Sequence, residues 1–183
     1  EEALFKGLVA AGYTMKREGG VLISVRDTDK SDLRELVKEY VAMGFHIYAT
    51  SGTASRLNSV GISSTLVKKP KEAKEGEKTT ISLLEEGKIS YVISTSKTGR
   101  QPGRDSVRLR RKAVELGIPC LTSLDTAAVL ALTLESQYNE DNVELVDIAH
   151  IAHGAAARKE LSQMEKPEEI QIPGYVLQEH END

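Results

Sequence analysis

The sequence has 183 residues, of which 39% are hydrophobic and 28% are charged, a balance typical of a soluble globular protein. It contains no apolar run of about 18 residues and no visible signal peptide, so we expect no membrane-spanning helix. Cys120 is the single cysteine, so an internal disulfide is excluded and a reducing, cytoplasmic compartment is expected.

Charge divides the chain into two parts, although the formal net charge is only −4. Residues 1–138 carry four more basic than acidic residues, whereas residues 139–183 carry eight more acidic than basic residues. Such a shift marks a boundary. We expect a leader helix and linker at 1–18, a main domain at 19–137 and an acidic extension at 138–183. The chain opens at Glu1 within a segment of helical character, so we also expect a fragment of a longer polypeptide.

Strands and helices are predicted to alternate along residues 20–136. Short apolar runs at 21–25, 45–50, 62–67, 91–95 and 118–121 predict strands, the third of them polar enough to lie near an edge. Amphipathic segments between them predict helices: one capped by Asp29 and ended by Gly44, one from Thr53 or Ala54 to Gly61, then 79–86, 104–116, and one capped by Ser123 or Asp125 that runs to about 136.

This alternation is typical of βαβ units. It predicts an α/β domain with a doubly wound, five-stranded parallel sheet and helices on both faces. Residues 143–164 predict a further helix in an appended C-terminal tail. Ligands of a doubly wound sheet bind at the carboxyl ends of its strands, so the loops that follow the strands carry the functional prediction.

The loop after the second strand reads Thr50-Ser51-Gly52-Thr53 and leads into a helix. Free backbone N–H groups and the helix dipole favour an anion at such a position. Gly52 allows the backbone to approach a ligand closely, and the neighbouring hydroxyls add donors. Hydroxyls at such turns are also common helix caps, so this loop alone leaves both interpretations open.

Cations and hydroxyls follow the other strands as well. They are Lys30 after the first strand, Lys69 after the third, and Ser94, Thr95, Ser96 and Arg100 at and after the end of the fourth. Because parallel strands end at one edge of a sheet, we expect these side chains to converge there. Phosphate is bound by such a mixture of positive charge and directed donors. The sequence therefore predicts phosphate binding, with a solvated basic rim as the alternative.

A basic run in the fifth predicted helix invites a nucleic-acid interpretation. Arg104, Arg108 and Arg111 share one helical face, but Arg110 points elsewhere and no stacking aromatic residues are interleaved. We therefore expect no nucleic-acid partner.

Metal and thiol chemistry have weaker signals. His150 and His153 are three residues apart on a predicted helix, yet no third ligand cluster accompanies them, so we predict no metal site. Cys120 lies in an apolar run and is interpreted as a small buried hydrophobe rather than a nucleophile.

Residues 20–136 also resemble a known family, the methylglyoxal-synthase-like domain at the C-terminus of the carbamoyl-phosphate synthase large chain. The matching stretches include Leu22-Ile23-Ser24-Val25-Arg26-Asp27-Thr28-Asp29-Lys30, Ala49-Thr50-Ser51-Gly52-Thr53-Ala54, Leu66-Val67-Lys68-Lys69, Asp105-Ser106 and Ile118-Pro119-Cys120-Leu121-Thr122-Ser123-Leu124-Asp125. Residues 3–12 resemble the end of the preceding synthetase domain. The resemblance covers about residues 1–137, in order, and leaves the tail uncovered.

The resemblance implies an allosteric domain that is not catalytic by itself. In this family the domain binds nucleotide effectors by their phosphate and relays the signal to ATP-using synthetase domains of a glutamine-hydrolysing ligase. The implied phosphate contacts are Lys30, Thr50, Thr53, Lys69, Thr95 and Ser96. The implied partners are the synthetase domains of the same chain and a small glutaminase chain, and self-association through this domain is left open. No cofactor is implied here; ATP, Mg and K belong to the synthetase domains.

Departures from the family pattern leave the effector open. Enterobacterial-type members have Asn where this chain has Ser94, and the loop 97–103 is longer, as in members from Gram-positive bacteria. Cys120 and Leu121 replace a Tyr and an Asp of the ornithine site, so ornithine is expected not to bind. A uridine nucleotide or a phosphoribosyl compound is expected instead. Methylglyoxal synthase itself and a plain interaction module remain as alternatives, the former weakened because residues 94–103 contain no carboxylate.

Overall fold

The computed structural model describes residues 1–96, 104–136 and 138–139. The chain divides into two compact units, Glu1–Val143 and Glu144–Asp183, and every described residue belongs to the first. The predicted helix over 143–164, with His150 and His153, therefore lies outside the described residues. In the part that is described, no helix combines the length and the hydropathy that crossing a membrane requires.

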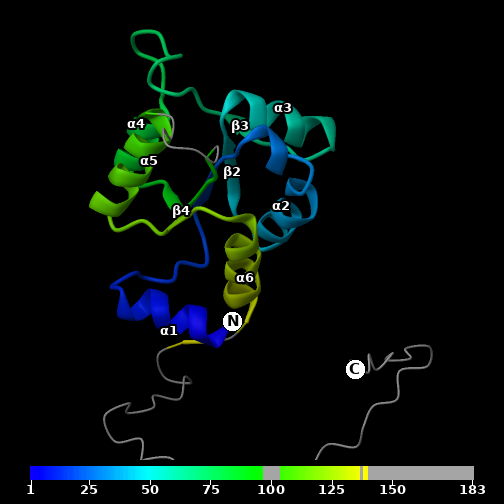
Figure 1. Cartoon of the computed structure of the whole chain (residues 1–183), viewed down its shortest axis with the longest axis vertical. Helices are drawn as coiled ribbons and strands as arrows, with labels where there is room; N and C mark the ends of the chain where they lie inside the picture. The colour runs from blue at the N-terminus through cyan, green and yellow to red at the C-terminus, as the bar shows by residue number, and fades with distance from the viewer. Residues whose placement is uncertain (97–103, 137, 140–183) are drawn as a thin grey trace, which may run out of the picture. The chain divides into compact units, whose positions relative to one another are not determined.

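Five parallel strands form the centre of the first unit (Figure 1). They are β1 (Gly20–Ser24), β2 (His46–Ala49), β3 (Thr65–Leu66), β4 (Ile89–Ser94) and β5 (Cys120–Leu121). Their order in the sheet is β3-β2-β1-β4-β5, and every neighbouring pair runs parallel. The predicted doubly wound α/β fold is therefore confirmed, and the chain changes direction across the sheet between β1 and β4.

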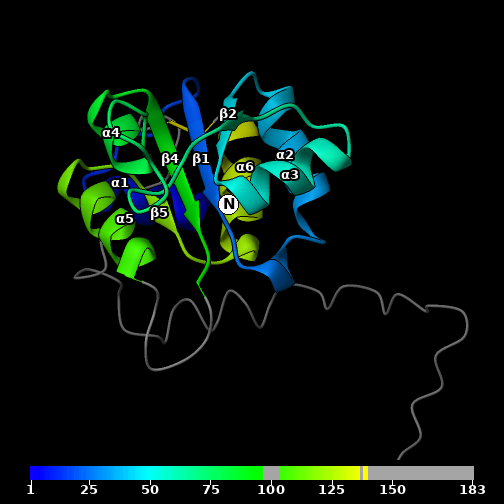
Figure 2. The ribbon, with the colours of Figure 1, turned by 90° about the horizontal axis from the view of Figure 1, so that it is seen from above.

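Helices cover both faces of the sheet (Figure 2). One face packs against α2 (Leu33–Ala42), α3 (Ser51–Ser59) and α6 (Leu124–Glu135). The other face packs against α4 (Thr80–Glu85) and α5 (Arg104–Glu115). The strand side chains alternate accordingly: Val21 and Ile23 enter the first core, whereas Leu22 enters the second. The N-terminal helix α1 (Glu2–Ala10) packs against α6.

The apolar spacing in α2 explains how this helix is held. Leu33, Leu36, Val37 and Tyr40 are buried, whereas Val41 is 47% exposed. The Tyr40 hydroxyl donates a hydrogen bond to the carbonyl of Ala127 at 2.7 Å, which ties α2 to α6. Gly44 ends the segment with a φ of 89°, a conformation that other residues rarely adopt.

Two helix starts differ from the prediction. Asp29 does not cap α2, because Asp27–Asp29 form a short 3₁₀ turn, η1, in which the Asp29 carboxylate pairs with Arg26 at 2.6 Å. Helix α2 starts only at Leu33. Helix α3 starts earlier than expected, at Ser51, with Thr50 as its N-cap residue. Gly52 and Thr53 therefore lie within its first turn.

Candidate functional site

A pocket of about 370 Å³ opens at the carboxyl edge of the sheet, where the strand order changes direction. Its lining comes from residues 24–27 at and after the end of β1, Thr50 after β2, Lys69 after β3, Thr95 and Ser96 after β4, Thr80 of α4, and Asp105, Ser106 and Leu109 of α5. Segments far apart in the sequence thus converge at one place, as the alternation of strands and helices predicts.

The predicted site residues separate into groups in the structure. Thr50, Lys69, Thr95 and Ser96 line the pocket. The remaining predicted residues that the structure describes do not line the pocket; they are Lys30, Ser51, Gly52, Thr53 and Ser94. Ser51 is exposed, and its hydroxyl oxygen lies 3.4 Å from a carboxylate oxygen of Glu72. Arg100 lies outside the described residues.

Several of the predicted hydroxyls already bind the chain itself. The Val25 backbone N–H donates to the Thr53 hydroxyl oxygen at 3.3 Å, and the Arg26 N–H donates to that of Thr95 at 3.0 Å. The hydroxyl oxygens of Thr50 and Ser24 are hydrogen-bonded at 3.3 Å. Thr50 occupies the N-cap position of α3 without a side-chain capping bond. These buried hydroxyls therefore fix the loop after β1 rather than cap the helix.

The cations around the pocket differ in whether they are already paired with a carboxylate. Arg26 pairs with Asp29, and the Lys30 ammonium lies 2.6 Å from a carboxylate oxygen of Asp27. Lys69 is half-buried, and its ammonium group makes no hydrogen bond or ion pair with any described residue. Lys69 is therefore the pocket cation whose charge is available to a ligand.

Asp29 fixes the loop that carries these cations. Burial raises the pKa of this carboxyl, but hydrogen bonds from Arg26, Thr95 and Thr28 outweigh burial, so the pKa lies below its ordinary value. Asp29 therefore stays ionised near neutral pH and holds the Arg26 guanidinium beside the pocket.

Gly52 and Lys30 meet at the first turn of α3. A Cβ at Gly52 would lie 2.6 Å from the Lys30 ammonium nitrogen, so the missing side chain leaves room for this cation. The first N–H groups of a helix have no intrahelical partner and carry a partial positive charge. The Lys30 ammonium, paired with Asp27, therefore lies beside a helix end that favours anions, and this helix end follows Thr50 of the pocket wall.

Sequence reasoning missed part of the lining. Ser24 and Thr80 were not identified as site residues, although both line the pocket. Ser24 is the last residue of the buried strand β1, and a hydroxyl at that position was a usable signal. Thr80 had no such signal, because a long-range backbone hydrogen bond from its N–H to the Lys68 carbonyl, at 2.9 Å, brings it there.

One carboxylate oxygen at this site has no hydrogen-bond partner among the described residues. Asp105, in the first turn of α5, lines the pocket, and its Oδ1 is buried without a hydrogen bond among the described residues. A buried carboxylate oxygen without a donor is costly, so this atom is suited to accept a hydrogen bond or proton from a ligand.

Comparison with known proteins identifies the domain. The family model described as MGS-like domain matches residues 32–122. The chain carries an MGS-like domain. The matched range runs from the start of α2 to the end of β5, and it includes Thr50, Lys69, Ser96 and Asp105 of the pocket. A crystal structure of methylglyoxal synthase from Elizabethkingia anophelis NUHP1 is similar at 17% identity and a TM-score of 0.49, over 66% of this chain and 80% of that chain.

Cys120 lies on β5 of the MGS-like domain and is half-buried. Burial raises the pKa of its thiol to about 11, and the nearby positive charge of Arg110 only partly opposes this. The thiol is therefore protonated at neutral pH, which fits the interpretation of a small hydrophobe. Among the described residues, no group of three His, Cys, Asp or Glu side chains is placed to hold a metal ion.

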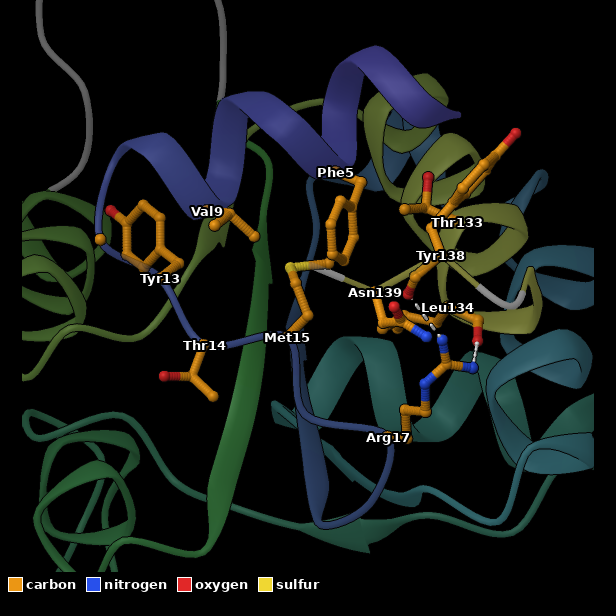
Figure 3. Close-up of a pocket in the computed structure, with 11 residues that line it drawn as sticks. Phe5, Val9, Tyr13, Thr14, Met15, Arg17, Thr133, Leu134, Tyr138 and Asn139 are labelled. Carbon is orange, nitrogen blue, oxygen red and sulfur yellow. Dashed lines mark hydrogen bonds between the residues drawn. The ribbon is translucent and has the colours of Figure 1, made fainter. Parts of the chain in front are cut away.

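A larger hollow, of about 610 Å³, lies between α1 and its linker on one side and α6 on the other (Figure 3). Its lining includes the apolar side chains of Phe5, Val9 and Met15. The guanidinium of Arg17 donates to the carbonyls of Leu134 and Ser136 at 2.7 and 2.8 Å, so its charge satisfies the C-terminal end of α6. The smaller pocket at the sheet edge, with converging polar groups and an uncommitted lysine, is the better candidate for ligand binding.

Proposed function

We propose that this MGS-like domain is the regulatory domain of a glutamine-dependent carbamoyl-phosphate synthase large chain. It binds a phosphorylated effector, a uridine nucleotide or a phosphoribosyl compound, and modulates carbamoyl phosphate synthesis for pyrimidine or arginine biosynthesis. The supporting observation is the half-buried Lys69, whose ammonium has no partner among the described residues, in a pocket edged by hydroxyls and a helix N-terminus.

Phosphate chemistry accounts for this arrangement. A phosphate group carries negative charge and several acceptor oxygens, so it is held by a cation together with directed donors. Lys69 supplies the uncommitted charge, Ser96 supplies a hydroxyl, and Thr50, the N-cap residue of α3, brings the N-terminal end of that helix to the pocket wall. The volume of about 370 Å³ falls in the range of small-molecule pockets, so the ligand can extend beyond its phosphate.

Regulation requires partners beyond this domain. The proposal places the synthetase domains in the same cytoplasmic polypeptide and a small glutaminase chain beside them. An effector acts on them only if it binds two states of the whole enzyme with different affinity. The domain itself needs no metal or cofactor in this proposal, because the chemistry takes place elsewhere in the enzyme.

Titration calorimetry with UMP, IMP and phosphoribosyl pyrophosphate tests effector binding. At least one of these compounds is expected to bind the unaltered chain. Lys69→Ala is expected to weaken that binding about tenfold or more, the effect of losing one charged hydrogen bond. Lys68→Ala is the matched control, because the neighbouring Lys68 ammonium pairs with Glu77 at 2.8 Å; affinity should change less than twofold.

The calorimetric outcomes distinguish the alternatives. If none of the three compounds binds, effector binding is overturned, and a domain that serves only as an interaction module is favoured. Binding that Lys69→Ala leaves unchanged would place the effector site elsewhere in the chain.

A second candidate function is favoured by Asp105. A lyase of the methylglyoxal synthase type abstracts a proton next to a carbonyl and eliminates phosphate, which requires a carboxylate base close to the bound phosphate. Asp105 lines the pocket with an unpartnered buried oxygen, whereas Asp27 is committed to Lys30. Incubation with dihydroxyacetone phosphate decides between the candidates. Turnover well above background that Asp105→Asn abolishes would replace the regulatory proposal by the catalytic one.

A further inference from the structure

We propose that Arg110 is a positioning residue of the phosphate pocket and acts through Ser96. Its guanidinium holds the Ser96 hydroxyl so that the hydroxyl proton is directed to a phosphate oxygen of the ligand. The inference rests on the proposed function and deepens it, because it explains how one hydroxyl of the pocket becomes a dedicated donor.

The geometry of α5 brings Arg110 to this position. Leu109 and Ala113 of the same helix are buried against the sheet, which places Arg110 beside the buried face. The Arg110 Nη2 atom lies 2.6 Å from the Ser96 hydroxyl oxygen, and Ser96 follows β4 on the pocket wall. Arg110 thus turns inward, toward the site, whereas Arg108 and Arg111 of the same basic run are exposed.

The direction of the hydrogen bond follows from the chemistry of the two groups. A guanidinium only donates, so the Ser96 oxygen accepts in this contact. The hydroxyl proton of Ser96 is then left for another acceptor, and no described residue supplies one. Because Ser96 lines the pocket, a phosphate oxygen is the acceptor that fits.

The charge of Arg110 supports the same conclusion. Its Nε atom is buried without a hydrogen-bond partner, and among the described residues it has no ion pair, not even with Asp105. A half-buried cation without a counter-charge is unfavourable. A phosphate bound at Ser96 would bring negative charge near the guanidinium and offset part of that cost.

A double-mutant cycle tests this coupling on the full chain, with UMP and with inorganic phosphate as probes. Arg110→Gln and Ser96→Ala are each expected to weaken binding of both probes about tenfold, the effect of one charged hydrogen bond. The double variant should bind no more than about twofold weaker than either single variant, because both changes remove the same interaction. Arg110→Lys should recover part of the affinity, since it keeps the charge but not the planar donor geometry.

Arg111→Gln is the matched control for charge. It removes one positive charge from the adjacent position, but the Arg111 side chain is 81% exposed and pairs with Glu115 at 3.0 Å. Its affinity for both probes should stay within about twofold of the unaltered chain. Thermal unfolding followed by circular dichroism checks that all variants are folded. Should Arg110→Gln not fold, the same cycle is read with Arg110→Lys.

The outcomes separate this inference from the proposed function. Additive losses for the Arg110 and Ser96 changes, or a loss confined to UMP and absent with phosphate, would overturn the positioning role. Unchanged affinity in the Arg110 variants, with Lys69→Ala still impaired, would overturn the positioning role alone. Absence of binding by the unaltered chain would overturn both proposals together.

Discussion

At the residue scale, Gly52 determines where the Lys30 ammonium can lie beside the pocket. Its absent side chain leaves the space that the Lys30 ammonium occupies, 2.6 Å from where a Cβ would stand. Gly52→Ala should displace Lys30, which is the flexible end of a long side chain, without unfolding the domain. We expect phosphate or UMP affinity, measured by calorimetry, to fall about two- to fivefold, the effect of moving one charge away from a helix end.

Stability should move in the other direction, because alanine is a better helix former than glycine. The control is Gly7→Ala in α1, where a Cβ would meet nothing within 4 Å and from which no residue lines the pocket at the sheet edge. It should show the same helix-forming benefit with unchanged affinity. If Gly52→Ala binds as tightly as the unaltered chain, Lys30 makes no contribution to the site.

Individual residues show where sequence reasoning succeeds and where it stops. The charge and hydroxyl types after each strand predicted that Lys69 and Ser96 would lie at the same edge of the sheet, and both line one pocket there. Thr53 has the same type and position, yet its oxygen accepts the Val25 N–H, a bond between residues 28 apart that no local pattern reveals. Arg110 likewise looked like one basic residue among several until its contact with Ser96 was visible.

At the element scale, α4 is a short helix that depends on its cap. It spans six residues, and the nucleation of so short a helix is unfavourable without added support. The Thr79 hydroxyl oxygen accepts the Ser82 N–H at 3.2 Å, while the Ser82 hydroxyl oxygen accepts the Thr79 N–H at 2.8 Å. Thr79→Ala should therefore lower the free energy of unfolding by about 1 kcal/mol, measured by denaturant titration with circular dichroism.

A hydroxyl elsewhere on a helix serves as the control for this change. The exposed Ser55 hydroxyl in α3 only donates back to the Ser51 carbonyl, so Ser55→Ala should stay within about 0.5 kcal/mol of the unaltered chain. Equal effects of the two substitutions on the free energy of unfolding would mean that the cap does not stabilise α4.

Element types followed from the sequence more closely than element boundaries did. Every strand and helix predicted for residues 20–136 is present, because burial on a sheet face or a helix face leaves a periodic record. The predicted third strand over 62–67 is reduced to Thr65–Leu66, which lie exposed at the sheet edge as expected. Helix boundaries were predicted wrongly where side-chain contacts determine them. Asp29, for example, pairs with Arg26 and lies in a 3₁₀ turn instead of capping α2.

At the scale of the whole unit, the N-terminal segment packs as part of the same body as the sheet. Phe5 of α1 is buried, and its ring lies 6.4 Å from that of Tyr138 beyond α6. Arg17 also donates hydrogen bonds to the carbonyls of Ser136 and Tyr138, which follow the end of α6; Figure 3 shows Arg17 beside Tyr138. The sequence favoured a leader belonging to a preceding domain, and that assignment stays a prediction. Its packing could not be foreseen, since one buried ring in nine helical residues is a weak signal.

Phe5→Ala tests whether α1 belongs to the cooperative unit. Removing a buried ring should lower the free energy of unfolding by about 3 kcal/mol. If α1 and the sheet unfold together, far-ultraviolet and tyrosine near-ultraviolet dichroism should follow one transition, shifted to a lower temperature. Val114→Ala, at a side chain that is 63% exposed on α5, should change stability by less than about 0.5 kcal/mol. An early, separate melting of the helix, with the main transition unchanged, would show that α1 only covers the sheet domain and does not stabilise it.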